Sequence, residues 1–170
     1  MKIKFAIIGF GHIGRKHYNM ILGNVEAEVV AICDPYLEEE SVDGIPVFKD
    51  IEQMLISIPE IDVVNICTPN GLHAEQSIIC INDGKHVVVE KPMSLTKKDA
   101  ENVIFHALNK HVKIFCVMQN RYTANAQFLK HLIVNNQLGN VKEVVVNFFW
   151  NRDKRYYFSG EGLQHAWRGN

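Results

Sequence analysis

Residues 3–14 read IKFAIIGFGHIG, and this stretch decides the fold. Its first six residues are mostly apolar, which is typical of a strand covered on both faces of a sheet. Gly9, Gly11 and Gly14 follow in the pattern G-x-G-x-x-G, ahead of a helical pattern that ends at Gly23. A strand, a glycine-rich turn and a helix in this order predict the start of a dinucleotide-binding βαβ unit.

Each glycine has its own expected part in binding a dinucleotide. Gly9 permits a tight turn, Gly11 lets the backbone approach a pyrophosphate, and Gly14 lets the helix pack closely on the strand. The following helix offers its N-terminal N–H groups and the positive end of its dipole to the phosphates. The loop residues predicted to bind the cofactor are Gly9, Gly11, His12, Ile13 and Gly14.

Asp34 supports the same interpretation and indicates which cofactor is bound. It ends the second predicted strand, 20 residues after Gly14, where an acid accepts hydrogen bonds from the ribose hydroxyls. A carboxylate there repels a 2′-phosphate, and neither Pro35 nor Tyr36 is an arginine that would receive one. The sequence therefore favours NAD over NADP. The alternative is a tight turn and a strand-end Asp before Pro35, with no cofactor.

The rest of the first 120 residues alternates between strand and helix patterns. Strands are expected at 3–8, 28–33, 62–67, 86–90 and 112–118, with a weaker one at 46–48. Helices are expected at 12–22, from the N-cap Asp50, at 72–82, and from the capping-box residue Thr96 to about residue 110. This alternation predicts an α/β fold with a doubly wound parallel sheet, the Rossmann type.

The pattern changes after residue 120, which divides the chain into predicted domains 1–120 and 121–170. A helix is expected at 124–136. Residues 141–150, VKEVVVNFFW, are expected to form an antiparallel strand. One helix and one strand cannot bury a core alone, so the second domain is expected to be the beginning of an α+β domain with an antiparallel sheet.

Charge and composition exclude several other classes of protein. The formal net charge is -1, which gives no basis for binding nucleic acid or an anionic membrane. The basic and apolar start of the chain lacks a cleavage site, so no signal peptide is expected. Cysteines 33, 67, 80 and 116 form no CxxC pair and are interpreted as reduced thiols of a cytoplasmic protein, and no metal site is expected.

A second group of polar residues follows the central strands. Thr68, Asn70 and His73 lie in CTPNGLH, Glu90 and Lys91 follow HVVV, and QNRY spans residues 119–122. In a doubly wound sheet, ligands bind outside the carboxyl ends of the strands, so these groups are expected to converge near the cofactor. The alternatives are a first-turn histidine, a solvated strand exit at Glu90 and Lys91, and a linker at 119–122.

Together these motifs resemble one family. GFGHIG, CDP, TPNGLH, EKPMSL and QNRY, in this order, resemble the Gfo/Idh/MocA oxidoreductases, relatives of glucose–fructose oxidoreductase and inositol 2-dehydrogenase. The resemblance implies a Rossmann domain followed by a domain with a large open antiparallel sheet, and oxidation of a sugar hydroxyl to a ketone. It also implies a peptide bond after the EKP lysine that is often cis.

The resemblance also assigns roles to residues. Lys91 matches the catalytic lysine, which orients the sugar and moves the hydroxyl proton while hydride goes to NAD. Thr68, Asn70, His73, Glu90 and Asn120 are expected around the cofactor, and Arg121 near the substrate.

A looser likeness concerns the end of the chain. FFWNRDKRYY and HAWRG resemble the branch that contains UDP-N-acetylglucosaminuronate 3-dehydrogenases of polysaccharide biosynthesis. Arg152, with Lys154 and Arg155, would then suit a uronate or diphosphate, and Trp167 and Arg168 would line the substrate site. The alternative is a solvated basic turn.

The chain departs from the family pattern at its end. It stops at Asn170, before the family's D-G-G-x…H stretch, whose His is the usual partner in proton transfer. We therefore expect it to hold NAD but to turn over poorly. A homo-oligomer is expected for the full-length protein, whereas an exposed strand at 141–150 could make this chain self-associate. Two alternatives remain open: a non-catalytic NAD-binding sensor, and an NAD-assisted glycoside hydrolase of the same family.

Overall fold

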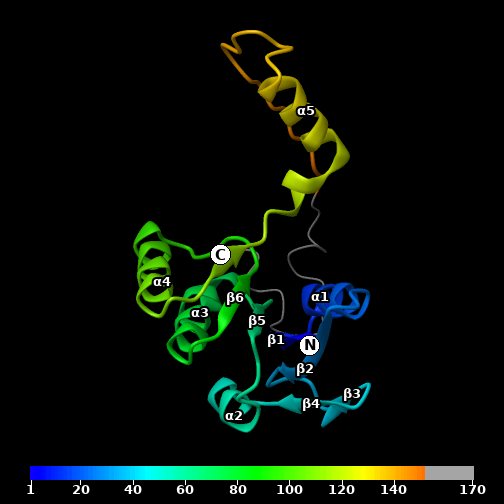
Figure 1. The fold of residues 1–170 in the computed structure, drawn as a ribbon, viewed down its shortest axis with the longest axis vertical. Coiled ribbons are helices and arrows are strands. Elements are labelled where there is room, and N and C mark those ends of the chain that lie inside the picture. Colours follow the sequence, from blue (N-terminus) through cyan, green and yellow to red (C-terminus); the bar gives the residue numbers. More distant parts are fainter. Residues whose placement is uncertain (152–170) are drawn as a thin grey trace. The chain divides into compact units, whose positions relative to one another are not determined.

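The computed structural model describes residues 1–151, and within them the chain folds around a seven-stranded sheet (Figure 1). The strand order is β3-β4-β2-β1-β5-β6-β7. The elements are β1 (Ile3–Ile8), α1 (His12–Leu22), β2 (Ala27–Cys33), β3 (Ser41–Val42), β4 (Ile45–Phe48), α2 (Ile51–Ser57), β5 (Val63–Ile66), the 3₁₀ helix η1 (Asn70–Leu72), α3 (His73–Asn82), β6 (His86–Val89), α4 (Lys97–Asn109), β7 (Ile114–Cys116), the 3₁₀ helix η2 (Gln119–Tyr122) and α5 (Ala124–Val134).

The sheet confirms the predicted doubly wound fold. All neighbouring strands pair in parallel except β3 and β4, whose short antiparallel ladder lies at one edge. Strand β1 lies between β2 and β5, so the chain proceeds outward from β1 in both directions. This reversal of strand order is where open α/β sheets bind ligands, outside the carboxyl ends of the strands.

Apolar side chains bury both faces of the sheet. On one face, Val64 and Val87 pack with Ile81 of α3, Val103 of α4 and Met54 of α2. Helix α1 covers the other face, as Figure 1 shows, through the buried side chains of its residues 18 and 21. Two-sided burial explains why the central strands are continuous apolar runs rather than alternating ones.

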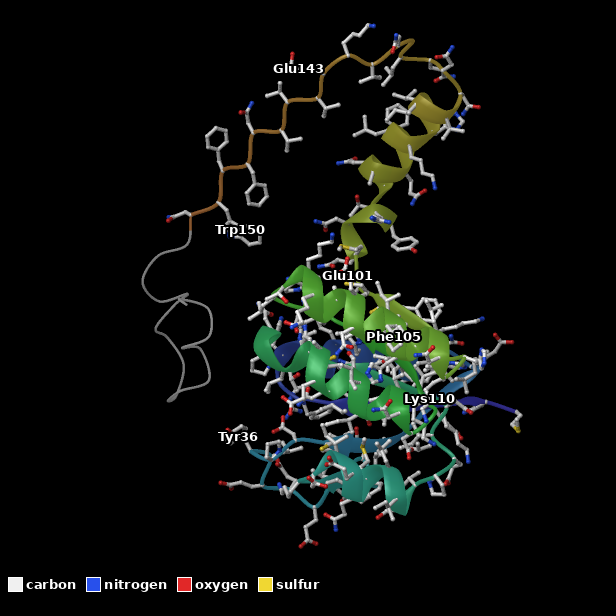
Figure 2. The ribbon with its side chains drawn as sticks, turned by 90° about the vertical axis from the view of Figure 1, so that its left-hand side faces the viewer. Tyr36, Glu101, Phe105, Lys110, Glu143 and Trp150 are labelled. Carbon is white, nitrogen blue, oxygen red and sulfur yellow. The ribbon has the colours of Figure 1, made fainter. Side chains whose placement is uncertain are left out.

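Two helices begin at the predicted caps. The Asp50 carboxylate accepts a hydrogen bond from the Gln53 N–H at 2.8 Å, and the Thr96 hydroxyl accepts one from the Asp99 N–H at 3.1 Å. Each bond satisfies an N–H group that has no partner inside the helix. Beyond its buried face, α4 exposes Phe105, which is labelled in Figure 2 with Glu101 and Lys110 of the same region.

The four cysteines form no disulfide, as the sequence predicts. Burial raises the pKa of the Cys33 and Cys80 thiols to about 12, and nearby carboxylates add to the shift. Both thiols therefore stay protonated near neutral pH and behave as small apolar core groups.

The chain divides into a compact unit Met1–Val117 and a second unit that begins at Met118. In the second unit, α5 forms where a helix is predicted, and it has no buried residue. The strand predicted at 141–150 is wrong for this structure: these residues form no strand, and Figure 2 draws Glu143 to Trp150 as plain chain. A strand requires a neighbouring strand that pairs with its N–H and C=O groups, and a sequence pattern alone does not supply one.

A close contact fixes where α1 starts. Gly9 has a φ of +84°, a left-handed conformation that favours glycine, and it turns the chain back against α1. A Cβ on Gly14 would lie 2.0 Å from the Gly9 carbonyl oxygen, so no larger residue fits without moving the helix. A Cβ on Gly11 would meet nothing within 4 Å.

These two glycines give a matched pair of variants. We expect Gly14→Ala to lower the free energy of unfolding by about 2–4 kcal/mol, because the helix must move away from the turn. We expect Gly11→Ala to cost less than about 1 kcal/mol, because its methyl group enters open space. Urea unfolding of both variants measures the difference. Equal stability of the two would contradict the close contact.

Candidate nucleotide-binding site

The glycine loop leaves the N-terminus of α1 open. Gly11 is the N-cap of α1, it supplies no side-chain cap, and the first turn of the helix contains no acidic residue. Within residues 1–151, the helix itself therefore supplies no side-chain acceptor for the N–H groups of this turn and no negative charge for the positive end of its dipole. His12 and Ile13 are exposed beside it. With the open space at Gly11, these features fit the pyrophosphate of a dinucleotide.

Asp34 links the end of β2 to the glycine loop. One carboxylate oxygen accepts a hydrogen bond from the Phe10 N–H at 2.7 Å, and the other accepts one from the Tyr36 N–H at 2.9 Å. Each oxygen keeps a further lone pair, so the carboxylate can still accept hydrogen bonds from two hydroxyl groups. Tyr36 is 83% exposed and lies at the surface in Figure 2. The carboxylate therefore has the chemistry needed for a ribose.

Thr68 and Asn70 lie in the segment after β5, as predicted. Thr68 is partly buried, and its hydroxyl donates to the Gln76 side-chain oxygen at 2.5 Å, which ties the segment to α3. Asn70 begins the short helix η1 and is also partly buried. Gly9 lies against this segment, since a Cβ on it would come within 2.9 Å of Thr68. The glycine loop and the segment after β5 are thus neighbours.

His73 is the first residue of α3, and its side chain is buried. It is 1% exposed, and its ring nitrogens contact main-chain carbonyl oxygens, Nδ1 with Pro92 at 2.7 Å and Nε2 with Thr68 at 2.8 Å. Both nitrogens are therefore engaged with the protein's own main chain, and a part for His73 at the cofactor stays a prediction. Because Thr68 and Pro92 follow different strands, the ring joins the two loops of the site.

Glu90 belongs to a partly buried polar network. Its side chain is 13% exposed, one oxygen lies 3.2 Å from His17 Nε2, and the other accepts a hydrogen bond from the Lys91 N–H at 3.1 Å. Burial alone raises the pKa of this carboxyl, but the hydrogen bonds from His17 and Lys91 and their charges outweigh it. The pKa of Glu90 therefore lies below its ordinary value, and the group is ionised near neutral pH.

Lys91 is exposed and precedes a cis peptide bond to Pro92. In the described residues 1–151, its amine makes no hydrogen bond or ion pair, although it lies close enough to lower the pKa of Glu90. An exposed amine at the end of a buried strand can reach a bound substrate. The structure therefore places the glycine loop and five predicted side chains at the carboxyl ends of the parallel strands. These side chains are Asp34, Thr68, Asn70, Glu90 and Lys91.

The other predicted residues belong to the second unit or fall outside the described residues. Asn120 and Arg121 are in η2, within the second unit, so their part in this site stays a prediction. Arg152, Trp167 and Arg168 lie outside the described residues, as do Lys154 and Arg155. The part of the chain that is described contains no group of His, Cys, Asp and Glu side chains that could hold a metal ion, and no helix in it is long and apolar enough to cross a membrane.

Sequence reasoning missed two members of the site, His17 and Asn65. Asn65 is 4% exposed in the middle of β5, and its Nδ2 lies 3.0 Å from His17 Nδ1. A polar residue inside the apolar run DVVNIC is a signal that could have found Asn65. His17 follows Gly14 by one helical turn, so the sequence places both on the same face of the helix. The residues around His17 in the sequence do not show which side chains it would contact.

Three features of this site are typical of an NAD-binding oxidoreductase domain. They are the glycine turn that leaves the N-terminus of α1 open, a carboxylate placed to bind a ribose, and a lysine at the strand ends. The family profile described as an oxidoreductase family with an NAD-binding Rossmann fold, GFO_IDH_MocA, matches residues 3–118. The chain therefore belongs to the Gfo/Idh/MocA oxidoreductase family. The sequence-based predictions of family and NAD as cofactor are confirmed.

Several proteins similar to this chain are dehydrogenases. The WlbA dehydrogenase of Bordetella pertussis, solved with NADH and UDP-GlcNAcA, is 33% identical with a TM-score of 0.90, covering 99% of this chain and 51% of that one. D-glucoside 3-dehydrogenase of Escherichia coli is 28% identical over 82% of this chain and 41% of the relative. An NADP(+) scyllo-inositol 2-dehydrogenase of Bacillus subtilis is 30% identical over 86% and 41%. The chain thus spans about half the length of its relatives or less.

The lowered pKa of Glu90 predicts a pH-dependent contribution to stability. Because this pKa is lower in the folded chain, ionised Glu90 stabilises the fold above the ordinary value of 4.5, and the contribution is lost as the pH falls through the folded value. We expect the stability difference between the wild type and Glu90→Gln to be largest above the ordinary pKa of 4.5 and to shrink as the pH falls below it. Urea unfolding across this range measures it. A difference that is the same at both ends would contradict the ionised, hydrogen-bonded carboxylate.

Proposed function

We propose that this chain is the cofactor-holding part of an NAD-dependent dehydrogenase that oxidises a hydroxyl group of a sugar or sugar nucleotide to a ketone. The observation that carries the proposal is the position of Lys91. Like Asp34 and the glycine loop, it lies at the carboxyl ends of the parallel strands. The dehydrogenase relatives support the reaction class. The structures of two WlbA dehydrogenases with UDP-GlcNAcA support a sugar nucleotide as the substrate.

The cofactor side of the site would be divided among three groups. The N-terminal N–H groups of α1, opened by Gly11, would hold the pyrophosphate, and the Asp34 carboxylate would accept hydrogen bonds from the ribose hydroxyls. A 2′-phosphate would meet the negative charge of Asp34, so NADP would bind more weakly than NAD. Bound NAD supplies the acceptor for the hydride that leaves the alcohol carbon.

Lys91 would act on the substrate hydroxyl. Its amine would first hold the hydroxyl oxygen by a hydrogen bond and then, in its neutral form, take the hydroxyl proton as the carbon–oxygen double bond forms. Loss of this proton and of the carbon's hydride together converts the alcohol to the ketone, which balances the reaction. The buried carboxylate of Glu90 would hold the main chain of Lys91 in place through its 3.1 Å hydrogen bond.

The remaining predicted residues would complete the substrate side. Arg121, Arg152, Trp167 and Arg168 are proposed there, with Asn120 near the cofactor, because of the motifs that contain them. Arginine matches the planar oxygens of a carboxylate or diphosphate, which a uridine diphosphate sugar acid carries.

Calorimetric titration with NAD and with NADP tests the cofactor assignment. We expect wild type to bind NAD more tightly than NADP, and Asp34→Ala to weaken NAD about 10- to 100-fold through the loss of hydrogen bonds to a charged group. Gly11→Ala should also weaken NAD, because its methyl group occupies the room for the pyrophosphate. Lys91→Ala should change NAD affinity by less than about threefold, since its proposed partner is the substrate.

Asp62→Ala is a matched control for Asp34→Ala. Asp62 also accepts a main-chain hydrogen bond, from the Lys4 N–H at 2.8 Å. It directly precedes β5, however, and so lies at the amino ends of the parallel strands, away from the proposed site. We expect its NAD affinity to equal that of the wild type. Equal affinity for NAD and NADP, or an effect of Asp62→Ala as large as that of Asp34→Ala, would contradict the proposed role of Asp34.

A further inference from the structure

We propose that His17 is a positioning residue for Lys91, acting through the Glu90 carboxylate, and that Asn65 fixes the orientation of the His17 ring. The three side chains come from α1, β5 and the segment after β6, and they form one connected chain of hydrogen bonds. This inference rests on the proposed function for the role of Lys91 itself. The network can be tested in the protein without any ligand.

The Glu90 carboxylate bridges the histidine and the lysine. One oxygen contacts His17 Nε2 at 3.2 Å, and the other accepts from the Lys91 N–H at 3.1 Å. A carboxylate with one oxygen bound can still rotate, whereas a carboxylate bound at both oxygens has its plane fixed. The hydrogen bond from His17 therefore sets the direction in which Glu90 holds the Lys91 main chain.

The partners of His17 determine its tautomer. The Glu90 carboxylate only accepts hydrogen bonds, so Nε2 of His17 carries the hydrogen. When the ring is neutral, Nδ1 is bare and accepts a hydrogen bond from the Asn65 Nδ2 at 3.0 Å. One tautomer satisfies both contacts, and the ring is held from both sides.

The Asn65 amide supports this arrangement at an energetic cost. Its Oδ1 is buried and has no hydrogen-bond partner among the described residues, which costs about 1–3 kcal/mol. Turning the amide over would place Oδ1 against the bare Nδ1 of His17, so two acceptors would face each other. The unsatisfied oxygen is therefore the consequence of directing Nδ2 at the ring.

Burial makes Glu90 sensitive to the loss of His17. The side chains of Glu90 and His17 are 13% and 14% exposed, so little water reaches the contact between them. Without the hydrogen bond from His17, burial still disfavours the charged carboxylate, and less opposes it. Glu90 would then titrate at higher pH or rotate toward solvent, and either change weakens the hydrogen bond by which it holds the Lys91 main chain.

The direct test follows Glu90 and Lys91 by nuclear magnetic resonance in the ligand-free chain. We expect His17→Leu to raise the pKa of the Glu90 carboxyl group, which is followed through the chemical shift of its carboxyl carbon. We also expect it to abolish the change in the Lys91 amide-proton shift that accompanies the titration of Glu90. We expect His17→Gln to restore both, because its side-chain amide can donate to the carboxylate. A folded His17→Leu chain with an unchanged Glu90 titration and an unchanged Lys91 amide would overturn the proposal.

Two further measurements keep the test decisive. Asn19→Ala is the control, since Asn19 is exposed on α1 and outside the network, and it should leave both signals as in the wild type. If His17→Leu does not fold, the ring nitrogens of His17 in the wild type decide: hydrogen on Nε2 and none on Nδ1 supports the proposal, and the reverse overturns it. Absence of NAD binding by the wild type would reject the proposed function and leave these results on the network standing.

Discussion

The contact between Gly14 and the Gly9 carbonyl is the constraint on which the site depends. A Cβ at residue 14 would lie 2.0 Å from that oxygen, so glycine there lets α1 lie directly against the turn after β1. One helical turn further on, the same close approach brings His17 within reach of Asn65 and Glu90. The helix N-terminus and the buried polar network are therefore both placed by one missing side chain.

The fold was predictable where local chemistry decides it. Continuous apolar strands, the glycine loop and the caps at Asp50 and Thr96 all form where the sequence places them. The two-residue strand β3 was missed because so short an edge pairing has no periodicity to read. The strand at 141–150 was predicted wrongly because a strand depends on a partner far away in sequence, which an alternating pattern does not supply.

The site was predictable in its surface residues and not in its buried ones. Asp34 and Lys91 follow buried strands, and topology alone brings strand ends to one edge. His73 also follows the rule, yet its ring turns inward and joins the loops after β5 and β6, which only the packing shows. His17 and Asn65 were missed because their meeting depends on how closely α1 approaches the sheet. The proposed substrate contacts belong to the second unit and to residues beyond those described.

The most direct test of the account is the mapping of NADH binding by amide chemical shifts in the isotope-labelled chain. The account predicts that the largest changes lie in the glycine loop 9–14, at Asp34–Tyr36, at Thr68–Asn70 and at Glu90–Lys91, which form one continuous patch at the carboxyl ends of β1, β2, β5 and β6. Chemical-shift changes confined to the amino ends of these strands, or no changes at saturating NADH, would contradict it.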